Sequence, residues 1–154
     1  MTTKTPPETF AVIGTTPPRV DAGAKVTGAA VYGVDVMRPR MAYGRILRSP
    51  HAHARIVRID TRRAEAMPGV LAVATAADLP AAVDDTANDR YARDATLASE
   101  RVLYHGHPVC AIAATTPEIA EDALALIDVD YEPLEPVLDV CRAMERDAPI
   151  LHPD

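Results

Sequence analysis

Aromatic residues are scarce in this chain, whose 154 residues include one phenylalanine and no tryptophan. Basic residues are also in the minority, with 16 lysines and arginines against 22 acidic residues and a formal net charge of -6. Nucleic-acid binding needs a basic surface for the phosphates and aromatic rings for base stacking. We therefore exclude nucleic acid as a partner.

Long apolar runs are missing as well. No stretch approaches the roughly 20 apolar residues that span a bilayer, and residues 1–7 are not followed by the apolar core of a signal peptide. We expect a cytoplasmic protein with no membrane partner. The two cysteines, Cys110 and Cys141, have no metal-ligand spacing, so we interpret both as reduced core thiols.

The length of the chain fits one domain of about 150 residues, but its first part differs from the rest. Residues 1–28 are rich in Thr, Pro and Gly and have no hydrophobic period, which predicts an extended arm that lies on another domain. Short β-rich runs follow at residues 30–36, 41–47 and 54–59. Their close spacing favours hairpins.

The middle of the chain alternates between short elements and polar segments. Asp60 is placed to cap a short helix over residues 61–67, and residues 70–75 have the composition of a strand. Residues 76–80 predict a single helical turn. Residues 81–99 have little periodic hydrophobicity, so we expect a long surface loop there.

The second half has the clearest pattern. Residues 109–114 form a small apolar run typical of a buried strand, and Thr115-Thr116-Pro117-Glu118 supplies the signals that start a helix, here running to about Ile127. Residues 128–132 then alternate acidic and apolar as a strand does, and a last short helix spans about 138–144. One shared core is expected from Val109, Ile112, Ile119, Ala123, Ile127, Val129 and Tyr131.

The order of these elements predicts the fold class. Strands and short helices alternate in two similar halves, each with a helix that packs on a mixed sheet. We therefore expect an α+β domain built from two β-helix-β half-motifs.

Four histidines form two pairs, His51 with His53 and His105 with His107. Imidazoles at this spacing are able to bind a transition metal. However, no carboxylate or thiol stands at ligand spacing from either pair, and both lie beside prolines in turns. We favour surface or interface histidines over a metal site.

The acidic residues of the second half give no sign of catalysis. Asp128, Asp130 and Glu132 alternate along a strand, which is typical of a solvated face rather than of an acid/base cluster. No Gly-x-Ser-x-Gly motif and no phosphate-binding glycine loop is present. We assign no catalytic, cofactor-binding or metal-ligating residue in this chain.

Four arginines lie in the β-rich region: Arg45, Arg48, Arg55 and Arg58. They are compatible with a solvated sheet face and equally with a docking surface for an acidic partner. The sequence does not choose between these two interpretations.

Taken together, the motifs resemble the opening of the molybdenum-binding subunit of the xanthine dehydrogenase and aldehyde oxidase family. The resemblance rests on residues 19–32, 47–56, 59–60, 66–70, 104–109 and 123–134. The Lys-Val-Thr-Gly motif at residues 25–28 is more similar to the xanthine dehydrogenase and 4-hydroxybenzoyl-CoA reductase type than to the carbon monoxide dehydrogenase type. Two residues depart from the family pattern: His107 replaces a common glutamine or acid, and Cys110 replaces the usual alanine.

The resemblance implies the α/β hammerhead fold at the N-terminus of a molybdopterin-binding large subunit. It implies an arm over residues 1–28, the hammerhead over 29–146 and the start of a linker over 147–154. The family's cofactor loops and glutamate base lie in the larger region that follows the hammerhead. We therefore expect this chain alone to bind no molybdenum, iron or flavin and to be inactive.

For the complete enzyme, the resemblance implies oxidative hydroxylation of an aldehyde, an N-heterocycle or an aromatic substrate. Molybdopterin with molybdenum would belong to the full subunit, and iron–sulfur clusters would belong to a partner subunit. A further partner subunit would carry FAD where one is present. The alternative from another class is a freestanding hammerhead module that binds or assembles without redox activity.

Interface residues are expected in the arm and in the turn after the second β-rich run. The arm lacks periodic apolar residues that would hold it down by itself, and residues 48–53 crowd a turn with cationic and imidazole groups. The predicted interface residues are Arg19, Lys25, Arg48, His51 and His53.

Overall fold

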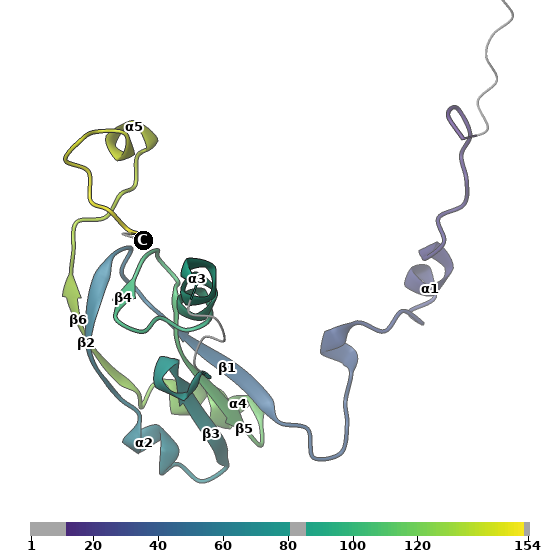
Figure 1. The fold of residues 1–154 in the computed structure, drawn as a ribbon. Helices are drawn as coiled ribbons and strands as arrows, with labels where there is room; N and C mark the ends of the chain where they lie inside the picture. Colours follow the sequence, from purple (N-terminus) through teal and green to yellow (C-terminus); the bar gives the residue numbers. More distant parts are fainter. Residues whose placement is uncertain (1–11, 81–85, 153–154) are drawn as a thin grey trace, which may run out of the picture. The chain divides into compact units, whose positions relative to one another are not determined.

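The computed structural model describes residues 12–80 and 86–152. The chain divides into two units between Pro39 and Arg40, and each unit is described by itself (Figure 1). No helix within the described residues is both long enough and apolar enough to cross a membrane.

The first unit contains two short helices and no strand among its described residues, 12–39. Helix α1 spans Ala22–Val26, and the 3-10 helix η1 spans Gly33–Asp35; neither contains a buried residue. The strand predicted over residues 30–36 is therefore wrong. Its valines favour a strand, but residues 12–39 contain no strand to pair with, and the Asp35 carboxylate instead accepts the Tyr32 N–H at 2.9 Å.

The second unit is built on two three-stranded sheets (Figure 1). In the first sheet the order is β1 (Tyr43–Arg48), β5 (Pro108–Ala114) and β3 (Val70–Thr75). In the second it is β4 (Arg101–Val102), β2 (Ala54–Asp60) and β6 (Asp128–Pro133). Successive strands therefore enter the two sheets in turn.

This alternation corrects two predictions. Every strand pair in the described part of the chain is antiparallel, so the sheets are not mixed. No pair among the described strands joins two that are consecutive in the chain, so the predicted hairpins are wrong as well. The α+β class with short helices beside sheets is confirmed, and strand β3 has the predicted bounds.

Two helices pack against the first sheet. Helix α4 (Pro117–Leu124) contacts β1 and β5, and α2 (Arg62–Glu65) contacts β3 and α4. As predicted, a threonine caps α4: the Thr116 hydroxyl accepts the Ile119 N–H at 3.2 Å. The Asp60 carboxylate accepts the Arg62 N–H at 3.2 Å as predicted, but the N-cap residue of α2 is Thr61 rather than Asp60.

Three further helices complete the second unit in its described residues. Helix α3 spans Ala87–Thr96, so the predicted loop over residues 81–99 is wrong where the structure describes it; residues 81–85 lie outside the described residues. The Thr86 hydroxyl starts α3 by accepting the Asp89 N–H at 3.2 Å. Helices η2 (Ala76–Asp78) and α5 (Val140–Ala143) confirm the predicted turn and the last short helix.

The core consists of two clusters rather than the single cluster that was predicted. Among the described residues, one surrounds Ile112, Ala123 and Ile127 between the first sheet and its helices, and the other brings Val109 of β5 together with Ala54 and Val102 of the second sheet. Val129 packs against both clusters. Cys110 is buried in the first cluster as predicted, whereas Cys141 is exposed, so its prediction as a core thiol is wrong.

Candidate interface

Two turns carry the histidine motifs and bind each other through the backbone. The Ser49 N–H donates to the His107 carbonyl at 2.9 Å, and the Gly106 N–H donates to the Ser49 carbonyl at the same distance. Arg48 adds a bond from its Nη1 to the Gly106 carbonyl at 2.9 Å. Gly106 has φ +84, a conformation in which glycine is favoured. The turn after β1 and the turn before β5 are thereby held together.

His107 is almost fully buried and has a partner on each ring nitrogen. Its Nδ1 accepts the Leu103 N–H at 3.1 Å, so its Nε2 carries the hydrogen and donates to the Asp94 carbonyl at 2.8 Å. Burial lowers the pKa of His107, and the bond to Asp94 opposes this only in part. The Tyr104 ring stacks on the imidazole with centroids 4.4 Å apart. His107 is a structural residue, so its expected surface or interface role is wrong.

His53 is also buried, and it fixes the chain where it leaves the second sheet. Its Nδ1 donates to the Glu135 carbonyl at 2.7 Å, and its own carbonyl accepts the Leu134 N–H at 3.0 Å. Its Nε2 is buried without a hydrogen-bond partner among the described residues. His53 therefore joins the turn after β1 to the segment after β6, and it does not offer its side chain to the surface.

His51 is the partly exposed member of its pair. Its ring meets Tyr131 edge to face, with centroids 5.0 Å apart, and its N–H donates to the Ser49 hydroxyl at 3.0 Å. Burial raises the pKa of Tyr131. Of the three residues predicted in this turn, His51 and Arg48 keep exposed surface, and His53 does not.

Arg19 and Lys25, the predicted interface residues of the first unit, share one partner. Arg19 Nε lies 2.6 Å from Asp21 Oδ1, and Lys25 Nζ lies 2.5 Å from Asp21 Oδ2. Lys25, and then Arg19, lower the pKa of Asp21. Both cations are thus paired within the unit, and the single Asp21 carboxylate offsets one of their two positive charges.

The four arginines of the β-rich region do not form one basic cluster. Arg45 and Arg48 lie on β1 in the first sheet, and Arg55 and Arg58 lie on β2 in the second. Arg45 Nε binds Glu121 at 2.9 Å, Arg58 Nε binds Asp130 at 3.0 Å and Arg55 binds Glu132. These pairs favour the solvated sheet face over a docking surface for an acidic partner. They also give Asp130 and Glu132 of β6 a role as cross-strand partners of β2.

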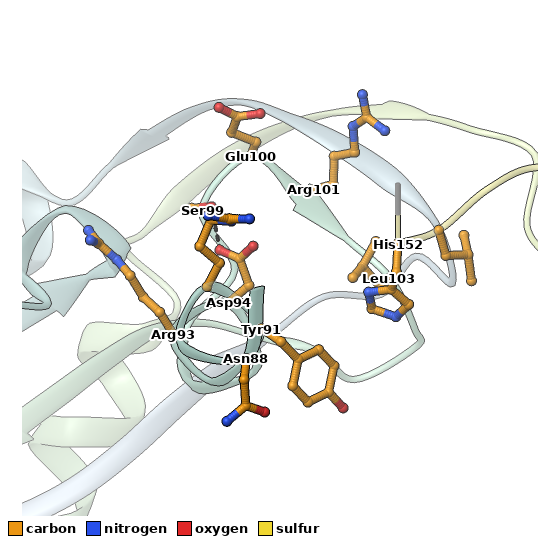
Figure 2. A pocket seen from close by; sticks show the side chains of 11 residues that line it. Asn88, Tyr91, Arg93, Asp94, Ser99, Glu100, Arg101, Leu103 and His152 are labelled. Atoms are coloured by element: carbon orange, nitrogen blue, oxygen red, sulfur yellow. Dashed lines mark hydrogen bonds between the residues drawn. The ribbon is translucent and has the colours of Figure 1, made fainter. Parts of the chain in front are cut away.

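A polar cavity that sequence reasoning missed lies between α3, β4 and the end of the described chain. Its volume is about 740 Å³, and its lining carries both charge signs. Figure 2 shows Asp94 turned towards Ser99, whose hydroxyl donates to the carboxylate at 2.7 Å, and Tyr91 near His152, with rings 5.5 Å apart. The Thr86-x-x-Asp89 spacing is typical of a helix N-cap, so it could have predicted α3. Since α3 lines the cavity, the same spacing could have pointed to the cavity.

The positions of the His, Cys, Asp and Glu side chains show whether this part of the chain fits a metal ion. Residues 12–80 and 86–152 contain no group of three or more His, Cys, Asp or Glu side chains that could hold a metal ion. The ring nitrogens of His107 and Nδ1 of His53 are already used by the backbone. These residues do not fit a molybdenum or zinc centre, and we derive no catalytic step through a metal on this chain.

Residues 27–135 match the family model described as "Aldehyde oxidase and xanthine dehydrogenase, a/b hammerhead domain". The chain belongs to this family. The carbon monoxide dehydrogenase large chain of Afipia carboxidovorans is 44% identical over 135 residues, which are 82% of this chain and 16% of that relative. A probable xanthine dehydrogenase subunit from Bacillus subtilis is 41% identical over 140 residues, which are 88% of this chain and 18% of that relative.

Solved structures of hammerhead-family proteins agree with the observed fold. Aldehyde oxidoreductase from Desulfovibrio desulfuricans has a TM-score of 0.77 at 29% identity, over 91% of this chain and 17% of that protein. Reconstituted CO dehydrogenase from Oligotropha carboxidovorans has a TM-score of 0.74 at 41% identity, over 88% and 17%. The α/β hammerhead predicted from the motifs is confirmed. The chain spans about a sixth of the length of these relatives.

Sequence identity to the relatives does not show whether this chain is of the xanthine dehydrogenase type or of the carbon monoxide dehydrogenase type. The carbon monoxide and xanthine dehydrogenases are 44% and 41% identical to this chain, so overall identity does not support the narrower assignment made from the motif at residues 25–28.

Proposed function

We propose that this chain is the N-terminal structural domain of a molybdenum hydroxylase large subunit. It supports oxidative hydroxylation of an aldehyde, an N-heterocycle or an aromatic substrate by the complete enzyme, and alone it has no activity. The observation that carries this proposal is the hammerhead match over residues 27–135, within relatives that are about six times longer.

The proposed layout has three parts. Residues 1–28 act as an arm, residues 29–146 form the hammerhead, and residues 147–154 begin a linker to the molybdopterin-binding region. The family match from residue 27 supports the first boundary. The compact second unit begins later, at Arg40, so residues 29–39 would be the part of the hammerhead that depends most on neighbouring structure.

The cofactors and partners belong to the complete enzyme. A relative from Eubacterium barkeri, 33% identical over 149 residues, is named a nicotinate dehydrogenase large molybdopterin subunit, which supports molybdopterin in the full subunit. We place the iron–sulfur clusters in a partner subunit and FAD in a further one. We also place the assembly in the cytoplasm, where the exposed thiol of Cys141 would stay reduced.

Expression of the complete gene with its neighbours tests this function. We expect a large subunit that copurifies with an iron–sulfur subunit and yields molybdopterin on extraction. The chain of residues 1–154, purified without a histidine tag, should contain no stoichiometric molybdenum, iron or flavin. A reading frame that encodes no molybdopterin-binding region would reject this function and favour the freestanding module.

A further inference from the structure

The two ends of the described chain share a feature that its middle lacks: large aliphatic side chains stand almost fully in solvent. In the first unit, Val20, Val26 and Val34 are 103%, 85% and 84% exposed. In the segment after β6, Leu138, Val140 and Met144 are 80%, 75% and 84% exposed. The most exposed aliphatic residues on the two sheets reach only 45–59%, at Ile46, Val57 and Leu71.

Key charged groups at both ends, in contrast, already have partners. Asp21 binds both Arg19 and Lys25 in the first unit. In the segment after β6, Arg142 binds Asp147 at 2.7 Å, Glu135 at 3.6 Å and also Glu145. These charged groups therefore have partners within the chain, whereas the six aliphatic side chains are exposed to solvent.

An apolar contact of this kind suits a permanent neighbour better than a diffusing one. Permanent interfaces are more hydrophobic than transient ones, and transient electron-transfer contacts are small and depend on charge. Under the proposed function, the permanent neighbour with the most surface is the remainder of the large subunit, since this chain spans about a sixth of its relatives.

We propose that Val20, Val26, Val34, Leu138, Val140 and Met144 are anchors that insert into apolar surface of the molybdopterin-binding region of the same subunit. This inference rests on the proposed function and names the contact groups. It replaces the expected charged contacts of Arg19 and Lys25 with aliphatic ones.

Two probes compare the chain of residues 1–154 with the full-length large subunit. The first is the alkylation rate of Cys141, an exposed residue next to Val140 in α5. The second is hydrogen exchange of the amides of α1. In the full-length subunit, we expect both rates to fall by at least about tenfold, because covered segments open less often.

Substitutions then separate apolar from charged contacts. In the full-length subunit, Val140→Asp and Met144→Asp should restore fast alkylation of Cys141, and Val20→Asp should restore fast exchange in α1. The matched controls Arg146→Gln and Arg19→Gln alter a neighbouring charge in the same segments and should leave both probes protected. Val20→Thr, which keeps the shape of valine, serves as a milder test should an aspartate variant fail to accumulate.

The outcomes distinguish this inference from the function on which it rests. A full-length product without molybdopterin rejects the proposed function. If the product contains molybdopterin, but Cys141 is alkylated and the α1 amides exchange as fast as in the short chain, the proposed anchor contacts are rejected and the proposed function is not. Equal loss of protection in Arg19→Gln and Val20→Asp would assign the contact to charge and also overturn the inference.

Discussion

The body of the second unit, residues 40–133, and the two ends of the described chain are held in different ways. The body has two buried clusters joined by Val129 and an antiparallel ladder in each sheet. The ends have short helices organised by caps and ion pairs, as at Asp21 and Arg142, and their helices α1, η1 and α5 contain no buried residue. Local hydrogen bonding is thus sufficient to shape a segment, whereas burial is needed to stabilise one.

The two cysteines give the sharpest test of this difference, since one lies in each region. Burial raises the pKa of the Cys110 thiol to about 11, which lowers its thiolate fraction near neutral pH about a hundredfold. Cys141 is exposed. We expect iodoacetamide to alkylate Cys141 in the native chain more than about a thousandfold faster than Cys110, because occlusion adds to the ionisation effect. Mass spectrometry of partly labelled protein measures both rates, and similar rates would remove the contrast.

Truncation of one aliphatic residue in each region is the next test. Ile112→Ala should cost roughly 2–5 kcal/mol of unfolding free energy, the usual range for a buried isoleucine. Val34→Ala, at an exposed position of the first unit, should cost less than about 0.5 kcal/mol. Urea denaturation of the two variants decides this. A large loss in Val34→Ala would mean that the first unit contributes to the core.

The buried His107 should make the body sensitive to mild acid. Burial lowers its pKa in the folded chain, so below an unfolded value of about 6.5 the unfolded chain takes up a proton that the folded chain resists. Stability should therefore fall as the pH drops through and below this value. His107→Gln should flatten the dependence between about pH 7 and pH 5, and His105→Gln, at an exposed position, should leave it unchanged. A flat wild-type profile would contradict this assignment.

The exposed ion pairs between β2 and β6 should have the smallest effect. Arg58 binds Asp130 of β6 and also Asp60 of its own strand, and because the Arg58 and Asp130 side chains are both more than half exposed, solvent and salt screen the cross-strand pair. Arg58→Gln should lower the melting temperature slightly, and about 1 M NaCl should abolish the difference from the wild type. A large loss that persists in salt would show that Arg58 has a packing role.

Local patterns predicted the elements of the body well, because each had a strong signal of its own. Strand β3 came from a continuous apolar run, and helix α4 came from the hydroxyl of Thr116 ahead of Pro117. Helix α3 was missed because its arginines and aspartates make it polar on average, and the contacts that hold it include the Thr86 cap and a bond of Arg93 to the Ala76 carbonyl at 3.1 Å.

The candidate interface was harder to predict, because tertiary contacts decide it. The sequence around His53 and His107 does not distinguish them from the other histidine of each pair, which keeps exposed surface. The carbonyls that bind them, from Glu135 and Asp94, belong to segments distant in the sequence. The ion pairs of Arg55 and Arg58 depend in the same way on β6 becoming the neighbour of β2. By contrast, the ordered set of family motifs was sufficient to identify the hammerhead.

The alternation of strands between the two sheets also governs when the domain is able to fold. Strand β1 pairs with β5, so Tyr43 needs a partner, Ala114, that lies far ahead in the chain. Strand β2 pairs in the same way with β6, where Asp60 lies opposite Asp128. Without a hairpin among the described strands, no early pair forms a local nucleus, and such long-range pairing folds slowly. During synthesis, strands β1 to β4 therefore leave the ribosome before either sheet can close, and the nascent chain keeps its unpaired edges exposed until β6 has emerged.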